Sequence, residues 1–326
     1  MPVPARAPSP TGPRDLRSLG AGIAGVFLIS WSPILVVLSG ATPGTAAFYR
    51  VLFGAGLLAL YAVVRRDGAL PTRRSAVLAA ASGLFLALDL QFLHESIARL
   101  GPGLATLLAN LQVIVLALFG AALFRERPAK RAILAVPLAL AGLTLTVKDS
   151  WWTVGLDYQA GVLFGLLTAV CYAGFLLLLR TAHSASPGAS RSTHLACASL
   201  AAVALLGVLE SSLGAVPRAP TGTGWGYLVL YAVSSQFLGW ILITRALESL
   251  PVIRLGLVLL FQPALSLTWD WLLFGRSLSP IESLGVAVAL TAILLGNSSR
   301  SSVPPTKPSV PHDATLEAGR AWHTMA

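Results

Sequence analysis

Residues 103–124 read GLATLLANLQVIVLALFGAALF, a run without one charged side chain. At a rise of about 1.5 Å per residue, this run is long enough to cross the ~30 Å hydrocarbon layer of a bilayer as a helix. Two further uncharged runs lie at 19–40 and 161–179. The core of a soluble protein does not need such runs, so the sequence predicts an integral membrane protein.

The composition also argues against an ordinary soluble domain. Of the 326 residues, 55% are hydrophobic and 11% are charged, whereas soluble domains carry about 25% charged residues. The net charge of +10 does not indicate a nucleic-acid-binding protein, because the basic residues lie in short clusters between apolar segments. Cys171 and Cys197 both lie inside apolar segments, so we expect structural thiols and neither a disulfide framework nor a metal site.

Clusters of Gly, Pro and charged residues divide the chain into apolar segments that predict about ten transmembrane helices. The segments are 19–40, 46–64, 75–100, 103–124, 132–147, 161–182, 194–215, 225–249, 253–275 and 280–297. We expect them to form two five-helix domains, at 19–147 and 161–297. Residues 1–18 and 298–326 are rich in Pro, Ser and charge, so we expect disordered cytoplasmic tails there.

The distribution of basic residues predicts the orientation in the membrane. If the N-terminus is cytoplasmic, 18 of the 23 Lys and Arg residues fall in cytoplasmic segments, and Arg99, Lys148, Arg218 and Arg276 fall outside. Cytoplasmic loops carry such an excess of basic residues. We therefore expect a multi-pass protein of the cell membrane, plasma or inner, with both termini cytoplasmic.

The chain contains an internal repeat. The stretch LGPGLATLLANLQVIVLALFGAALFRER at 100–127 aligns without gaps on LPVIRLGLVLLFQPALSLTWDWLLFGRS at 250–277, pairing Gln112 with Gln262. Because five helices per half is an odd number, the two halves should have opposite orientations in the membrane. Inverted repeats are common in secondary transporters, which bind substrate near the midplane between the halves. The sequence therefore predicts an all-α membrane fold of two inverted five-helix repeats around a central cavity.

Over residues 19–297 the chain resembles the EamA-type permeases of the drug/metabolite transporter superfamily. The resemblance rests on AAFYR at 46–50, HESIARLGPGLATLLANLQ at 94–112, LFRERP at 123–128, ALESLPVIRLGLVLLFQP at 246–263 and LLFGRSLSP at 272–280. It implies ten helices in two inverted halves, a central cavity, and export or exchange of small metabolites. It does not imply a particular substrate.

The chain departs from the family pattern at two positions. Val113 replaces the proline that Pro263 supplies in the second half, and Arg276 stands where Glu126 stands in the first. The first departure favours a straighter fourth helix. The second weakens the expectation that both turns have the same role.

Four polar side chains are expected near the middle of the membrane: Asp89, Gln112, Gln236 and Gln262. Asp89 precedes Leu100 by eleven residues, which places it about 16 Å from the outer surface. Charges at this depth cost about 2.5–3.5 kcal/mol on insertion scales and usually face the bundle interior or a wet cavity. We expect either that the amides bind substrate while Asp89 attracts charge or carries a proton, or that all four only join helices by hydrogen bonds.

Arg50 and Glu95 are expected at matching depths on neighbouring helices, with His94 beside them. An ion pair between them would offset the desolvation that each would suffer alone. Such a pair would fix helix packing or serve as a gate or an anchor for a substrate carboxylate, with His94 as a titrating member. Alternatively, Glu95 pairs with Arg99, one helical turn further along.

We make two further predictions, one about aromatic residues inside the membrane and one about acidic residues at its surface. Trp31 and Tyr172 lie mid-span in the first helix of each half, where they would line a cavity by stacking on substrate or pack in the bundle. Glu210 and Asp270 lie within two turns of the outer surface, so we expect them at the interface with water.

The leading hypothesis is a secondary transporter that moves a small metabolite by alternating access, with export implied by the family resemblance. Its partners would be a small-molecule substrate, the lipid bilayer and a gradient of protons or another ion, and the chain would act alone or as a homodimer. We expect no nucleic acid, no cofactor, no metal and no catalytic residue. The alternatives are a membrane-embedded enzyme acting on lipid, through Asp89, His94 and Glu95, and a non-transporting scaffold or sensor.

Overall fold

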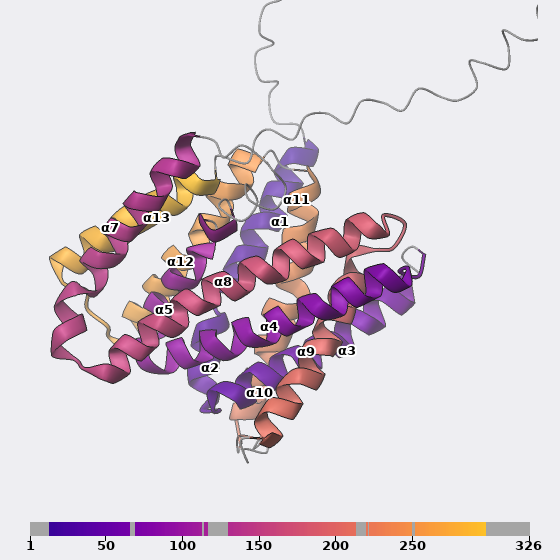
Figure 1. Cartoon of the computed structure of the whole chain (residues 1–326), viewed down its shortest axis with the longest axis horizontal. Helices are drawn as coiled ribbons and strands as arrows, with labels where there is room; N and C mark the ends of the chain where they lie inside the picture. Colours follow the sequence, from indigo (N-terminus) through magenta and orange to yellow (C-terminus); the bar gives the residue numbers. More distant parts are fainter. Residues whose placement is uncertain are drawn as a thin grey trace, which may run out of the picture.

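A computed structural model describes residues 13–65, 69–112, 114–116, 130–212, 220, 222–249 and 252–297, and this part of the chain contains helices and no strand (Figure 1). The first repeat contributes α1 (Pro13–Ser30), α2 (Ser32–Ser39), α3 (Pro43–Arg65), α4 (Arg73–Leu100), α5 (Pro102–Asn110) and α7 (Lys130–Thr153). The second contributes α8 (Leu156–Ala185), α9 (Arg191–Ser212), α10 (Gly224–Tyr231), the π-helix η1 (Ala232–Gly239), α11 (Trp240–Ser249), α12 (Val252–Phe274) and α13 (Pro280–Asn297).

The helices confirm the predicted all-α membrane fold. In the described part of the chain, six of them are long and apolar enough to cross a membrane by length and composition, and shorter apolar helices accompany them. Each predicted segment contains helix, but several bounds differ from the prediction by a few residues, and α8 begins at Leu156 where 161 was predicted. The helix predicted at 132–147 extends to Thr153, and α1 begins at Pro13, inside the predicted tail 1–18. The predicted tail 298–326, Val113 and Glu126 lie outside the described residues.

The first predicted span is broken in the middle, at Trp31 between α1 and α2. Pro33 is at the start of α2 and has no backbone N–H, so it cannot continue the hydrogen-bond ladder of α1. Helix α12 satisfies polar groups at the break: Ser266 Oγ donates to the Ser30 carbonyl at 3.1 Å, and Trp269 Nε1 donates to Ser30 Oγ at 3.0 Å. A mid-membrane break is tolerated where neighbouring helices satisfy the backbone in this way.

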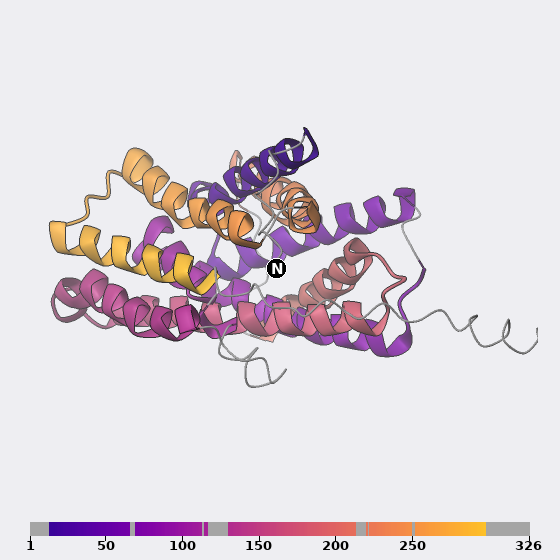
Figure 2. The same cartoon turned by 90° about the horizontal axis from the view of Figure 1, so that it is seen from above.

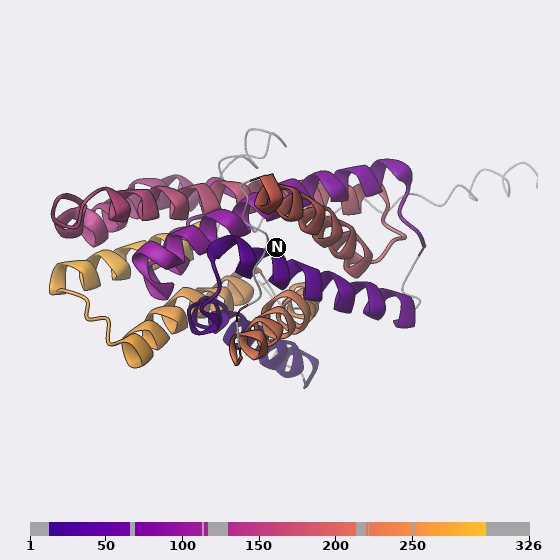
Figure 3. The same cartoon turned by 90° about the horizontal axis from the view of Figure 1, so that it is seen from below.

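Helices of the two repeats pack mainly against each other. Figures 1 and 2 show α4 beside α8 and α7 beside α13, and the same kind of contact joins α3 to α9 and α1 to α11. Figure 3 shows α12 and α13 connected by the loop at 275–279. Gly161 allows close approach of α8 to Arg99 and Leu100 of α4, since a methyl group there would lie 2.8 Å from both.

Two main clusters of buried apolar side chains hold the bundle together. One is formed by α5, α7, α8 and α13, and the other by α3, α4, α8 and α9. Helix α4 spans the distance between two ends of the molecule, which we call the Ser75 end and the Leu100 end. At the Ser75 end the loops before α4 and before α9 are joined, because Ala69 N donates to the Gly188 carbonyl at 2.9 Å.

Candidate functional site

A chain of buried hydrogen bonds connects five polar residues from α3, α4, α9, α10 and η1. Arg50 Nη1 donates to the Tyr231 hydroxyl at 2.7 Å, and Arg50 Nε donates to Gln236 Oε1 at 3.1 Å. Gln236 Nε2 donates to Ser199 Oγ at 3.1 Å, and the Tyr231 hydroxyl lies 2.9 Å from His94 Nε2. We call these residues the Arg50 chain. Arg50 is the most exposed of the five, at 8%, so the chain is removed from solvent.

The elements that hold the Arg50 chain are irregular or contain small residues. Gln236 lies within the π-helix η1, and π-helical turns are rare and frequent at functional sites. Gly54 leaves room for Gln236, because a methyl group at Gly54 would overlap the Gln236 side chain. The Arg50 guanidinium also lies 5.0 Å from the centre of the Tyr231 ring, a favourable cation–π geometry.

The chemistry of the donors fixes the direction of the bond between Arg50 and Tyr231. A guanidinium can only donate, so the Tyr231 hydroxyl accepts from Arg50. The hydroxyl still has its own proton and a second lone pair, so it can donate to His94 Nε2 or accept from it, depending on the tautomer of the imidazole. The Tyr231 hydroxyl is therefore the group that joins Arg50 to His94.

Asp89 is a second buried ionisable residue, 4% exposed on α4. Arg50 is the charged residue with an electrostatic effect on its carboxyl group. Among the described residues, no donor forms a hydrogen bond with this carboxyl group. Arg50 and Asp89 therefore do not form a direct ion pair.

A cavity of about 350 Å³ lies at the Leu100 end and includes His94 of the Arg50 chain. Its lining is mostly apolar, and His94 and Asp270 are its polar side chains. The lining residues are Val36, Val37, Ala41, Pro43, His94, Ile97, Ala98, Gly101, Pro102, Asp270 and Phe274. Cavities of this size hold small molecules, and a few polar groups in an apolar lining orient them.

Glu210 and Asp270, which are predicted within two turns of the outer surface, are buried by neighbouring helices, at 4% and 2% exposed. Their depth in the membrane stays a prediction. Asp270 accepts from Gly103 N at 3.0 Å at the start of α5, a favourable position for an anion. Glu210 packs against Gly44 in the first turn of α3, where a methyl group would overlap its carboxylate.

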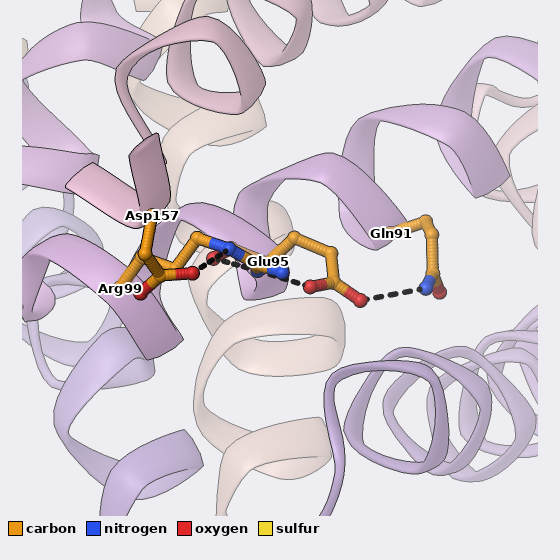
Figure 4. Close-up of polar contacts among 4 residues, drawn as sticks. All are labelled: Gln91, Glu95, Arg99 and Asp157. Carbon is orange, nitrogen blue, oxygen red and sulfur yellow. Dashed lines mark hydrogen bonds and ion pairs between the residues drawn. The ribbon is translucent and has the colours of Figure 1, made fainter. Parts of the chain in front are cut away.

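Glu95 forms its ion pair with Arg99, the second of the two predicted alternatives, and Arg50 binds Tyr231 and Gln236 instead. Figure 4 shows Gln91, Glu95, Arg99 and Asp157 in one row, from α4 to the first turn of α8. Arg99 Nε lies 3.0 Å from Asp157 Oδ1, and Gln91 Nε2 donates to Glu95 Oε1 at 3.5 Å. Neighbours one turn apart on the same helix pair easily, which explains why Glu95 stays at the helix surface.

The predicted set of four mid-membrane polar residues does not form one group. Gln236 belongs to the Arg50 chain, and Asp89 lies within its electrostatic reach. Gln112 and Gln262 are half-buried and lie outside the Arg50 chain, and the buried Oε1 atom of Gln112 has no hydrogen-bond partner among the residues that the structure describes. The structure therefore brings Arg50, His94 and Gln236 together and leaves Gln112 and Gln262 apart from them.

Both predicted aromatic residues pack on other aromatic rings. Trp31 stacks on Trp269 with ring centres 4.7 Å apart, directly at the break between α1 and α2. Tyr172 lies 5.8 Å from Phe175 and 6.4 Å from Trp240, and it also interacts electrostatically with Asp89. Whether either ring contacts a substrate remains a prediction.

Sequence reasoning missed Tyr231 and Ser199, which complete the Arg50 chain. A tyrosine in mid-span, five residues before Gln236, is a signal for the first, because a phenol hydroxyl in a membrane needs a partner. Ser199 carries no signal of its own among the small residues of α9. In the described part of the chain, no group of three or more His, Cys, Asp or Glu side chains could hold a metal ion.

Comparisons with known proteins place the chain in a family. The EamA-like transporter family matches residues 16–148 and 159–298, so each half of the chain is one family repeat. No curated protein sequence matches. A solved structure described only as "Crystal structure of protein" is similar at a TM-score of 0.62 and 18% identity, covering 86% of this chain and 97% of that chain, which supports the fold alone. The chain therefore belongs to the EamA-like transporter family, and it is a multi-pass membrane transporter of the drug/metabolite type.

Proposed function

We propose that the protein is a secondary carrier for a small amphipathic metabolite, of which an amino-acid-like zwitterion is the best example. The observation that supports this proposal is the burial of a guanidinium, Arg50, and a carboxyl group, Asp89, with Arg50 joined through Tyr231 to His94 in the cavity lining. A charge inside a membrane is costly unless it is matched. Both the Arg50 guanidinium and the Asp89 carboxyl group retain donor or acceptor atoms with which a bound solute would form hydrogen bonds.

The chemistry of the two groups indicates what they would bind. A guanidinium has five N–H donors, and the bonds of Arg50 to Tyr231 and Gln236 use two of them. A substrate carboxylate would accept from the remaining donors in a charge-assisted hydrogen bond. Asp89 would attract a substrate ammonium group, while the apolar cavity lining would accommodate an apolar side chain.

The two ends of the molecule support alternating access as the mechanism. The cavity lies at the Leu100 end, and hydrogen bonds join two loops at the Ser75 end. The basic residues indicate that the Leu100 end is external and that both termini are cytoplasmic. Because α4 packs along α8 of the other repeat, we propose that the ends open in turn while this contact is kept. Export, driven by a gradient of protons or another ion, follows from the family resemblance.

Uptake into proteoliposomes tests the substrate class. We would compare a set of apolar amino acids with their decarboxylated amines and with their deaminated acids, with and without an imposed pH gradient. The proposal expects counterflow of the zwitterions and at least tenfold less with either analogue. Transport of the amines as fast as the amino acids would exclude Arg50 as a carboxylate anchor.

The same preparation distinguishes a carrier from a membrane enzyme acting on lipid. A carrier requires two compartments, so its signal disappears when the vesicles are dissolved in detergent. An enzyme that uses Asp89, His94 and Glu95 would instead form product in detergent. Product formation from lipid substrates in micelles would therefore contradict the proposed function.

A further inference from the structure

The cavity at the Leu100 end has walls from both repeats. The first repeat contributes residues of α2, of α4 and of the turns before α3 and α5, and the second contributes two residues of α12. His94, Ile97 and Ala98 form the α4 wall, and Asp270 and Phe274 form the α12 wall. A molecule inside the cavity therefore contacts helices of both halves.

His94 and Ala98 give the cavity a direction. They are four residues apart on α4, so they share one face of the helix and are separated by about 6 Å along its axis. His94 is 0% exposed and is joined through the Tyr231 hydroxyl to Arg50, whereas Ala98 is exposed. The cavity thus extends along α4 from a buried polar end at His94 to an exposed apolar end at Ala98.

The two polar side chains of the lining differ in what they leave for a ligand. Asp270 Oδ2 accepts from Gly103 N at 3.0 Å and lies 3.9 Å from Arg276 Nη1, so its charge is compensated within the wall. The buried Nδ1 atom of His94 has no hydrogen-bond partner among the described residues. In either tautomer of a neutral imidazole this atom donates or accepts one hydrogen bond. The cavity therefore fits a solute with a polar group at His94 and an apolar group toward Ala98.

The volume of the cavity indicates a large apolar group. About 350 Å³ equals the share of about a dozen water molecules in the liquid, which is room for an aromatic ring and far more than a methyl group needs. The smallest lining residues are Ala41, Ala98 and Gly101. Gly101 has a φ of +83°, a conformation that favours glycine, so its size is set by the backbone. Ala98 lies in a regular helix, where its small size has no such backbone cause.

We propose that Ala98 is a specificity-determining residue, whose small side chain keeps the cavity wide enough for an aromatic or large aliphatic group of the solute. This inference rests on the proposed function, because it selects among the amino-acid-like solutes proposed there. A larger residue at position 98 fills part of the space that such a group occupies. Solutes with a small side chain do not need this space, so their transport is independent of the residue at position 98.

Counterflow of two amino acids in proteoliposomes tests the selection. We would compare phenylalanine with alanine in the native chain and in Ala98→Leu. The matched control is Ala80→Leu, an exposed alanine of α4 outside the cavity lining. We expect Ala98→Leu to lower the ratio of phenylalanine to alanine transport by about tenfold or more, and Ala80→Leu to keep it within about twofold. An unchanged ratio in Ala98→Leu would overturn the proposal.

Thiol labelling tests the width of the cavity without any transport. Ala98→Cys, with Cys171 and Cys197 replaced by serine, would react with a methyl and a benzyl methanethiosulfonate, each rate being divided by that of a free thiol. A wide cavity predicts rates within about threefold of each other. A benzyl reagent slower by about tenfold or more would overturn the proposal, and this test remains if Ala98→Leu does not fold. Equal labelling by both reagents without transport of any amino acid would reject the proposed zwitterion and support the width of the cavity at Ala98.

Discussion

Gln236 of η1 lies directly against Gly54 of α3, in space that any larger residue at position 54 would occupy. The contact aligns the Gln236 amide so that its oxygen accepts from Arg50 and its nitrogen donates to Ser199. A backbone feature of one repeat therefore positions a polar side chain of the other. The consequence is that helix packing and the Arg50 chain cannot be changed independently.

Replacing Gly54 by alanine should push α3 and η1 apart. The new methyl group overlaps Gln236, so we expect a loss of about 1–3 kcal/mol of stability and reduced transport. Gly56→Ala on the same helix is the matched control, because its methyl group would meet no atom within 4 Å. Thermal unfolding followed by size-exclusion chromatography in detergent would compare the two. Equal melting temperatures would contradict the contact.

Tyr231→Phe removes the hydroxyl that links Arg50 to His94. Arg50 Nη1 and His94 Nε2 both lose a buried partner, at a cost of about 1–3 kcal/mol each. We expect transport to fall about tenfold or more while the protein still inserts in the membrane. Tyr227→Phe, a half-buried tyrosine of the same helix, should leave transport within about twofold of the native rate.

Asp89→Asn tests the role of the negative charge. Asparagine keeps the shape of the buried side chain and removes its attraction for a substrate ammonium group or a proton. We expect transport in proteoliposomes to be impaired by an order of magnitude, with insertion and melting temperature unchanged. Transport that equals that of the native chain would assign Asp89 to the packing of α4.

Two carboxylates that lie near an arginine should differ in their effect on stability: Asp270 Oδ2 is 3.9 Å from Arg276 Nη1, and Asp157 Oδ1 is 3.0 Å from Arg99 Nε. Asp270 is buried and accepts from Gly103 N, so Asp270→Ala should destabilise the protein by about 1–3 kcal/mol. The Asp157 side chain is 78% exposed beside Arg99, so Asp157→Asn should change stability by less than about 1 kcal/mol. Chemical denaturation of both variants in the same detergent measures the difference. A larger effect of Asp157→Asn would contradict the assignment of the buried carboxylate.

Most of the fold follows from local properties of the chain. Uncharged runs such as 161–179 define membrane spans because the bilayer sets a required length, and Pro33 lies at the break between α1 and α2. The pairing of Glu95 with Arg99 could also be anticipated, since both residues lie one turn apart on one helix. These features depend on neighbours in sequence.

Which residues make up the candidate site depends on which helices pack against each other. Arg50 is separated from Tyr231 and Gln236 by more than 180 residues of chain, and the packing of α3 against α10 and η1 brings them together. The π-helix η1, which contains Gln236, packs against α3, so its place in the site depends on contacts between residues that are distant in sequence. The burial of Asp270 likewise required the start of α5 as its partner.

By itself, the sequence determined that this protein lies in a membrane as two helical repeats. The length of the apolar segments and the similarity of the two halves are both properties of the linear sequence. The tertiary structure decided which polar residues meet. A buried charge or amide takes the nearest partner that removes it from lipid, and that partner is chosen by the crossing of helices, as for Arg50 with Tyr231 and Ser75 with His194.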